Sequence, residues 1–436
     1  MLTPVDRRLL ALAVPTLGAL LAQPVFVLID TAMIGHLSTV SLAGLGVAAT
    51  LASTVVGLLV FLAYQTTASV ARLIGAGDLA GGLRTGWDGV WAGTLIGLAA
   101  ASGLAWFGKA GARALGADEA VASEAASYLL AAAPGVVGTL VIFAATGTLR
   151  GLSSVRVVLA VEVAGAIANI GLNAVFIYGL GLGVAGSGLG TSVAQLGMAA
   201  AFLVVMGKKA RLVGVSLRPR LSGLRGVGRA GWPLFVRTVS LRLSILATVW
   251  AAAGLGLGAL SGHQIVVSVW SFSAFALDAV AIAAQTLVGE SLGASDGPAA
   301  RALLRRCLGW GIGGGALLGA VIAAGTPWLV LAFTSDASVT GPASGALWVA
   351  AAGLPLAGLV YVLDGVLIGA GDGRYLAWSG VLNLLAYLPV LAALVALAPG
   401  LGLPGLWVAY CAAFMGARAV TLGARARTDR WLVLGR

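Results

Sequence analysis

Long apolar segments alternate with short polar connections along the whole chain. Each apolar segment has about 20 residues or more, which is the length that an α-helix needs to cross the hydrocarbon core of a membrane. The first segment is too long for the apolar core of a secretory signal. Twelve spans are predicted, near residues 8–35, 44–71, 85–108, 122–148, 157–180, 184–206, 229–253, 257–289, 303–326, 342–369, 375–398 and 403–424. The pattern therefore predicts an all-α integral membrane protein.

The composition excludes several other classes of protein. Of 436 residues, 60% are hydrophobic and 9% are charged, against about 25% charged residues in soluble proteins. The two cysteines, Cys307 and Cys411, lack the spacing of a disulfide framework, zinc site or iron–sulfur cluster. The chain has no HExxH, GxSxG or Walker motif. We therefore expect no enzyme activity, no metal and no cofactor.

The basic residues indicate how the chain is oriented in the membrane. The net charge is +11, but the charges lie in short connections without a basic domain, so no nucleic-acid partner is expected. With a cytoplasmic N-terminus, 22 of the 26 basic residues are cytoplasmic, five of them C-terminal arginines beginning at Arg418. Lys109 and Arg113 lie outside, and Arg237 and Arg242 fall within a span. The positive-inside rule then places both termini in the cytoplasm. The protein is expected in the inner (plasma) membrane.

The two halves of the chain resemble each other at a constant offset, which equals half of its 436 residues. The matches are Pro15 with Pro233, Gly44 with Gly262, residues 74–78 with 292–296, and residues 147–151 with 365–369. Two parallel six-helix repeats follow, at residues 1–206 and 229–436, joined by a basic cytoplasmic linker at 207–228. Paired repeats around a cleft are typical of transporters that work by alternating access.

Four polar side chains are expected at one depth in the N-terminal repeat. Asp30 lies five residues, or about 8 Å, from the outer end of the first span. Asn169 and Asn173 share a face of the fifth span, and Thr191 lies at a similar depth in the sixth. An acid inside hydrocarbon is costly and thus a functional candidate, whereas the simpler interpretation is that these groups only tie helices together.

The C-terminal repeat carries charges within its spans as well. Arg237 and Arg242 lie in the seventh span, Asp278 in the eighth and Asp364 in the tenth. Neutral pairing is the simpler interpretation, and Arg237, Asp278 and Asp364 remain secondary ion-site candidates. Glu162, seven residues before Asn169, either releases protons inward or packs between helices.

Three ring-bearing residues of the eighth span have two interpretations each. His263 either titrates near neutral pH or forms a hydrogen bond between helices. Trp270 and Phe272 either line a drug-binding wall or serve packing.

The first-span string VFVLIDTAMIGHLSTVSLAGLGVA and the paired loops LIGAGD and SLGASD resemble the multidrug and toxic compound extrusion (MATE) family, in particular its DinF-like branch. The resemblance covers essentially the whole chain. It implies two V-shaped helix bundles and export of drugs coupled to inward flow of protons or sodium ions. It also implies that Asp30 is the essential acid of the first helix, that Pro15 is its bending proline, and that its polar partners are Gln23, Asn169 and Thr191.

Residues and resemblance together predict a secondary active multidrug antiporter. A proton from outside neutralises Asp30, bends the first span near Pro15 and expels an amphipathic, cationic compound; sodium is the second choice of ion. Some relatives have an acid where this chain has Asn173, so Asp30 carries any ion in the N-terminal lobe alone. The expected partners are small drugs and membrane lipids, and the protein is expected to be a monomer. A lipid-linked precursor flippase and a channel are the alternatives.

Overall fold

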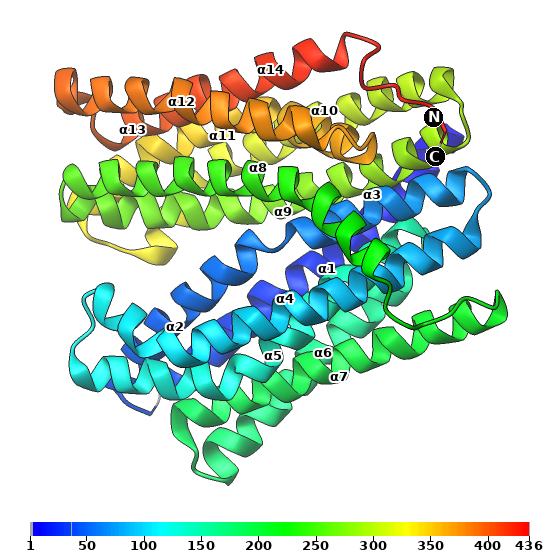
Figure 1. Ribbon diagram of the computed structural model, residues 1–436. Coiled ribbons are helices and arrows are strands. Elements are labelled where there is room, and N and C mark those ends of the chain that lie inside the picture. The colour runs from blue at the N-terminus through cyan, green and yellow to red at the C-terminus, as the bar shows by residue number, and fades with distance from the viewer. Residues whose placement is uncertain (1–2, 36, 436) are drawn as a thin grey trace. The chain divides into compact units, whose positions relative to one another are not determined.

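The computed structural model consists of α-helices along nearly all of its length (Figure 1). It describes residues 3–35 and 37–435, without the side chains at positions 23, 26–28 and 35, and this part contains no β-strand. The helices are α1 (Pro4–Gly35), α2 (Thr39–Leu58), α3 (Phe61–Gly75), α4 (Leu79–Ala114), α5 (Glu119–Gly151), α6 (Val155–Ala174), η1 (Val175–Gly179), α7 (Gly183–Leu212), α8 (Leu221–Gly254), α9 (Leu257–Gly293), α10 (Gly297–Phe333), α11 (Ala337–Gly369), α12 (Gly373–Leu397), η2 (Pro399–Leu401), α13 (Gly402–Val408), η3 (Ala409–Met415) and α14 (Gly416–Ala426). The predicted all-α fold is confirmed.

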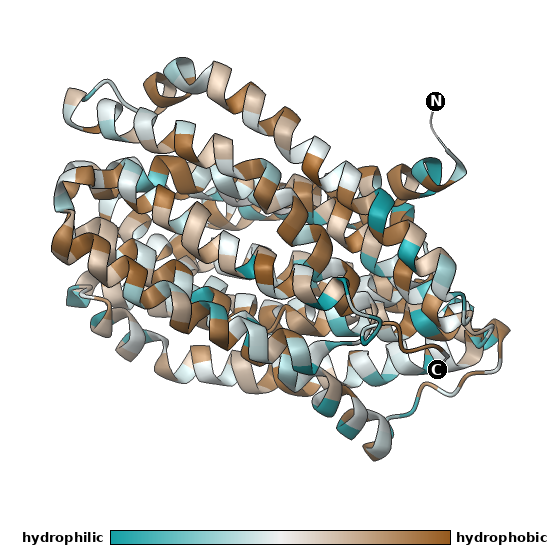
Figure 2. Cartoon of the chain, turned by 90° about the horizontal axis from the view of Figure 1, so that it is seen from above, coloured by the Kyte–Doolittle hydropathy of each residue, from teal (hydrophilic) through white to brown (hydrophobic). Residues whose placement is uncertain are grey.

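The helices account for the predicted spans. Eleven stretches of the described residues are long and apolar enough to cross a membrane, with α2 and α3 forming one stretch and η2 to α14 another. Together with α1 they make the twelve spans expected. Apolar residues cover most of the helix surfaces (Figure 2). The pattern did not reveal that the second span is interrupted at Leu59 and Val60, between α2 and α3.

Equivalent helices in the two repeats begin in the same way. Asp78 caps α4 and Asp296 caps α10, and each side chain accepts a hydrogen bond from the backbone N–H three residues on, at 2.8 and 2.9 Å. The preceding residues, Gly77 and Ser295, both adopt left-handed backbone conformations, with φ of +76° and +60°. These residues belong to the LIGAGD and SLGASD loops, which are therefore tight turns.

Equivalent glycines also bring the same helices together. A Cβ on Gly93 of α4 would lie 2.7 Å from the carbonyl oxygen of Leu140 in α5. A Cβ on Gly311 of α10 would lie 2.6 Å from the carbonyl oxygen of Gly358 in α11. The members of each pair are related by the offset of the repeat, and close backbone approach through small residues is how helices associate in membranes. The internal repeat thus extends from the sequence to the packing.

The chain forms two compact units. The first helix of each repeat, α1 or α8, begins in one unit and continues in the other. The N unit is Gly18–Gly231, and the C unit is Met1–Leu17 together with Trp232–Arg436. Consequently α1 begins in the C unit and continues in the N unit, whereas α8 does the reverse. Both changes occur within two residues of a proline, Pro15 or Pro233, at equivalent positions of the repeat. These units differ from the predicted lobes in two segments: Met1–Leu17 belongs to the C unit, and residues 207–231 belong to the N unit.

In the C unit, an ion pair attaches the beginning of α1 to α10. The buried carboxylate of Asp6 accepts hydrogen bonds from Nε of Arg306 at 2.6 Å and from Nε1 of Trp310 at 2.8 Å. We call these three residues the C clip.

In the N unit, a similar contact attaches the segment before α8 to α4. Asp88 of α4 pairs with Arg220, and Nε1 of Trp91 donates to the carbonyl oxygen of Leu217 at 2.8 Å. We call these four residues the N clip. The hydrogen bond to Asp88 raises the pKa of Arg220 above its ordinary value. The expected linker at 207–228 is therefore shorter than predicted: only residues 213–220 lie between α7 and α8, and they are bound to α4.

Candidate functional site

Asp30 is buried near the end of α1, with 6% of its surface exposed. Oδ1 of its carboxylate accepts hydrogen bonds from Oγ of Ser187 at 2.7 Å and from Nδ2 of Asn173 at 3.0 Å. Among the described residues, no lysine, arginine or histidine forms an ion pair with it. The acid is therefore held by neutral donors alone, in a place where an unpaired charge is costly.

The hydrogen bonds continue away from Asp30 into a chain of amides. Nδ2 of Asn173 also donates to Oδ1 of Asn169, and Nδ2 of Asn169 donates to Oγ1 of Thr191, both at 3.3 Å. Tyr128 of α5 lies within interaction range of Thr191 and Asp30. We call Asp30, Asn169, Asn173, Ser187 and Thr191 the Asp30 network. The structure thus brings together the four residues that the sequence placed at one depth, from α1, α6 and α7.

Local backbone features allow this approach. Asn173 is the last but one residue of α6, which continues directly into the π-helical turn η1; such turns are frequent at functional sites. A Cβ on Gly190 of α7 would overlap Oδ1 of Asn173. Only glycine at this position lets the amide of Asn173 lie against α7.

Ser187 was missed by the sequence analysis. It lies four residues before Thr191 in α7 and therefore on the same helix face, which is the signal that could have found it. The surrounding string AGSGLG, at residues 185–190, forms the first turns of this helix.

Two predicted members of the N-terminal site are not placed by side-chain contacts. The side chain of Gln23 lies outside the described residues, so its part in the site stays a prediction. Pro15 is half-buried in α1, two residues before the change from the C unit to the N unit. Its role as a bending point also stays a prediction.

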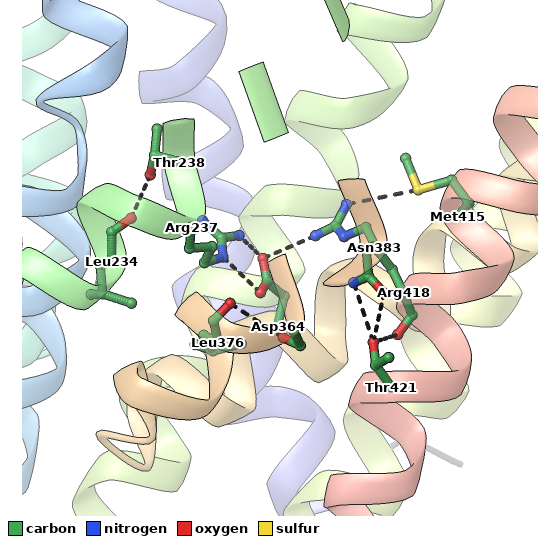
Figure 3. A network of polar contacts seen from close by, with 10 residues as sticks. Leu234, Arg237, Thr238, Asp364, Leu376, Asn383, Met415, Arg418 and Thr421 are labelled. Carbon is green, nitrogen blue, oxygen red and sulfur yellow. Dashed lines mark hydrogen bonds and ion pairs between the residues drawn. The ribbon is translucent and has the colours of Figure 1, made fainter. Parts of the chain in front are cut away.

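The C unit also holds a buried acid, Asp364, but its partners are positively charged (Figure 3). Asp364 of α11 accepts a hydrogen bond from Nε of Arg237 at 2.9 Å and pairs with the same guanidinium through Oδ2. Arg418 of α14 donates to Oδ2 at 3.2 Å. All three side chains are buried. This ion pair agrees with the simpler interpretation, in which the charges within the spans of this repeat neutralise one another.

Arg418 was missed by the sequence analysis. It was counted among the cytoplasmic arginines, but its side chain is buried, and its guanidinium lies 5.8 Å from the ring centre of Phe414. It is the second cation beside Asp364. Helix α14, which carries Arg418, follows directly after the π-helical η3. The second predicted acid, Asp278, lies near Tyr361, which is also within electrostatic range of both buried arginines.

The remaining candidates have mixed outcomes. His263 is buried against Trp407, with ring centres 5.7 Å apart, and neither of its nitrogens has a hydrogen-bond partner among the described residues. The expected hydrogen bond between helices is therefore wrong, because an aromatic cluster surrounds the ring. Trp270 packs in that cluster, whereas Phe272 is exposed. Glu162 is half-buried within electrostatic range of Arg150, and its role stays a prediction.

These two arrangements have different chemical capacities. The carboxylate of Asp364 is already neutralised by two guanidinium groups. The carboxylate of Asp30 has only neutral neighbours among its hydrogen-bond partners and can be neutralised by one proton or one monovalent cation. Among the described residues, no group of three or more His, Cys, Asp or Glu side chains could hold a metal ion.

Two repeats of six membrane-spanning helices, with a buried acid that no described cation pairs with, define a membrane transporter rather than an enzyme. The MatE family model matches the chain twice, at residues 15–175 and 233–393. The two matches are separated by the same offset that relates the repeats. The chain therefore belongs to the MatE family of multidrug and toxic compound extrusion transporters.

Relatives and solved structures agree with this assignment. Protein DETOXIFICATION 44, chloroplastic, of Arabidopsis thaliana is 31% identical over 448 residues, covering 99% of this chain and 84% of that protein. DNA damage-inducible protein F of Escherichia coli is 29% identical over 437 residues, covering 97% and 92%. A crystal structure of the Vibrio cholerae MATE transporter VcmN has the same fold, with a TM-score of 0.88, 21% identity and 98% coverage of both chains.

Proposed function

We propose that the protein is a secondary active antiporter that exports amphipathic, cationic compounds in exchange for protons bound at Asp30. The observation that carries this proposal is the burial of Asp30 among neutral hydrogen-bond donors, without an ion pair among the described residues. A single added proton then removes the whole charge of the site. Family membership supports the drug-like class of the substrate.

Protonation of Asp30 changes its hydrogen bonding as well as its charge. The ionised carboxylate only accepts, which matches the donors of Ser187 and Asn173. A protonated carboxyl carries a donor of its own and is a weaker acceptor. The attachment of α1 to α6 and α7 therefore weakens on protonation. This change, combined with bending near Pro15, is the proposed switch that drives the bound compound outward.

The orientation of the two asparagine side chains in the Asp30 network favours a proton over a sodium ion as the coupling ion. A sodium ion requires several oxygen atoms directed at one point. In the Asp30 network, Asn173 directs an N–H group at the carboxylate, and Asn169 directs one at Thr191. These donors suit a carboxylate that alternates between its charged and neutral forms. A cationic compound is attracted by the charged form and released by the neutral one, so compound and proton compete for the same charge.

The test is an efflux assay in proteoliposomes loaded with ethidium, a fluorescent amphipathic cation. A pH gradient and a sodium gradient are imposed separately on the wild type, on Asp30→Asn and on Asp429→Asn. The last variant removes an exposed acid paired with Arg301 at 2.7 Å and serves as the matched control. We expect pH-driven efflux from the wild type and the control, and only the protein-free rate from Asp30→Asn. Wild-type efflux driven by sodium alone, or full activity of Asp30→Asn, overturns proton coupling at Asp30.

The flippase alternative receives less support from the charges. A carrier of lipid-linked anionic precursors needs positive groups available to the substrate. The two buried arginines of the C unit, Arg237 and Arg418, are both bound to Asp364. A channel is tested in the same preparation, because single-channel currents without saturable exchange would replace the antiporter proposal.

We further propose that both termini are cytoplasmic and that the protein acts as a monomer. The strong bias of basic residues toward one set of connections supports the orientation. Protease accessibility of a C-terminal tag, in intact and in inverted membrane vesicles, tests the first point. Mass measurement of the purified protein in detergent tests the second.

A further inference from the structure

A groove lies along one face of α10 near its beginning. It has a volume of about 540 Å³ and is lined mainly by Arg305, Arg306, Gly309, Trp310, Gly313 and Gly314. Positions 306, 310, 313, 314 and 317 follow the spacing of one helix face. The groove therefore has a charged end toward the beginning of α10 and an apolar trough that continues along the helix.

The trough exists because several glycines in this segment are not used in helix packing. Gly311 and Gly315 face α11, where an added Cβ would meet backbone atoms. At Gly309, Gly313 and Gly314, an added Cβ would have nothing within 4 Å. Contact between α10 and α11 thus explains the first two glycines and leaves the other three unexplained.

The charged end offers a cation that the protein itself does not neutralise. The side chain of Arg305 is exposed and forms no hydrogen bond or ion pair with any described residue. Its neighbour Arg306 is bound to Asp6 in the C clip but remains 48% exposed. Trp310 donates its N–H to the same Asp6. The charges at this end sum to one net positive charge.

The equivalent helix of the other repeat shows that this arrangement is not a general feature of the fold. At the positions of α4 that the repeat makes equivalent to those of the groove, the chain has Trp87, Asp88, Trp91, Ala92, Leu95, Ile96 and Ala99. An acid stands where α10 has Arg306, and large side chains stand where α10 has Gly309, Gly313 and Gly314. The groove and its charge occur together on α10 and are both lacking at these positions of α4.

We propose that the α10 groove binds an anionic phospholipid of the cytoplasmic leaflet, with the phosphate at Arg305 and one acyl chain along the glycine trough. Basic pockets beside transmembrane helices on the cytoplasmic side are typical sites for anionic headgroups. Trp310 lines the groove beside its charged end, and tryptophan is enriched at membrane interfaces. The apolar trough below the charged end separates this site from one for a small soluble anion, because inorganic phosphate has no acyl chain to place there.

The test is native mass spectrometry of the purified full-length protein titrated with dioleoylphosphatidylglycerol or, as the neutral counterpart, dioleoylphosphatidylcholine. We expect tighter binding of phosphatidylglycerol to the wild type. Arg305→Gln should weaken phosphatidylglycerol about five-fold, which corresponds to one basic residue at a membrane surface, and should leave phosphatidylcholine unchanged. Gly313→Leu adds a side chain to the trough at a position where a Cβ has nothing within 4 Å, and it should weaken both lipids.

Two control variants make the same kinds of substitution at positions outside the groove. Arg301→Gln removes an exposed arginine one turn earlier in α10, where it pairs with Asp429. Gly103→Leu adds the same side chain to open space on α4. The proposal is overturned if Arg301→Gln weakens phosphatidylglycerol as much as Arg305→Gln does, or if Gly103→Leu acts like Gly313→Leu. It is also overturned if the wild type shows no headgroup preference, or if inorganic phosphate displaces the lipid completely. Thermal unfolding of each variant verifies that the compared proteins are folded.

Discussion

Asp30 in one repeat and Asp364 in the other are both buried, and their surroundings are opposite. Asp30 of the N unit is held by a hydroxyl and an amide, and no cation pairs with it among the described residues. Asp364 of the C unit is held by two buried arginines. The same helical scaffold therefore contains one acid whose charge can be removed by a proton and one whose charge is already neutralised. Duplication of a fold has not duplicated its chemistry.

The largest expected effect is a difference in stability between variants that lack one or the other of these two acids. Asp364→Ala removes the carboxylate that binds two buried guanidinium groups and should lower the free energy of unfolding by about 3–5 kcal/mol. Asp30→Ala leaves only two neutral donors unsatisfied and should cost about 1–3 kcal/mol. Thermal unfolding in detergent, followed by circular dichroism, measures both.

A triple variant sharpens the comparison of the acids. Replacing Arg237 and Arg418 with Met together with Asp364→Leu removes all three charges, and replacing a buried ion pair by apolar residues is often neutral. We expect this variant to recover most of the stability that Asp364→Ala loses. If Asp364→Ala is instead as stable as the wild type, the C unit does not depend on its ion pairs.

The next effect concerns the glycine beside the Asp30 network. Gly190→Ala adds a Cβ that overlaps Oδ1 of Asn173, so the amide must move away from Asp30. Overpacking of this kind costs about 1–3 kcal/mol, and pH-driven efflux should fall as far as in Asn173→Ala. Gly197→Ala is the control in the same helix, because nothing lies within 4 Å of its added Cβ. Equal behaviour of the two glycine-to-alanine variants would contradict the proposed role of Gly190.

A smaller effect is expected from the two clips. At equivalent positions of the repeat, the C clip has a basic residue and the N clip has an acidic one. Arg306 of α10 binds an acid from α1, whereas Asp88 of α4 binds an arginine from the segment before α8. Opposite polarity disfavours attachment of either segment to the wrong helix. Arg306→Gln should destabilise the beginning of α1 by about 1 kcal/mol, since the arginine is half exposed.

Amide hydrogen exchange of residues 3–17 measures this clip. Exchange should be about five-fold faster in Arg306→Gln and should return toward the wild-type rate when Arg306→Asp is combined with Asp6→Arg. Residues 221–231, at the start of α8, are the internal control, because they belong to the N unit. Unchanged exchange at residues 3–17 would show that the C clip does not hold α1.

The smallest effect distinguishes the two equivalent turns. Ser295 occupies a left-handed conformation where the other repeat has Gly77. Left-handed backbone is unfavourable for residues with a Cβ, and the greater freedom of glycine in the unfolded chain offsets part of this cost. Ser295→Gly should therefore stabilise the protein by about 0.5 kcal/mol, and Gly77→Ser should destabilise it by a similar amount. Chemical denaturation of both variants provides the measurement, and changes of the same sign would contradict it.

Much of the candidate site was accessible from the sequence because it depends on spacing along single helices. Asp30, Asn169, Asn173 and Thr191 were placed at one depth from their distances to the ends of their spans, and the hydrogen bonds join them. Ser187 shares a face with Thr191 and could have been included on the same ground. Arg418 could not have been, since its position near the chain end gives no sign that it turns toward Asp364.

The sequence by itself determined the twelve spans, the internal repeat and the turns that begin equivalent helices. Each of these depends on local properties: the length of an apolar segment, a constant offset, or a capping side chain three residues from its partner. Only the tertiary structure decided which charges meet. The pairing of Asp364 with Arg418 and the exchange of helix beginnings between units depend on how helices rotate and pack against one another. Hydropathy is insensitive to that rotation in a chain whose helices are apolar on nearly every side.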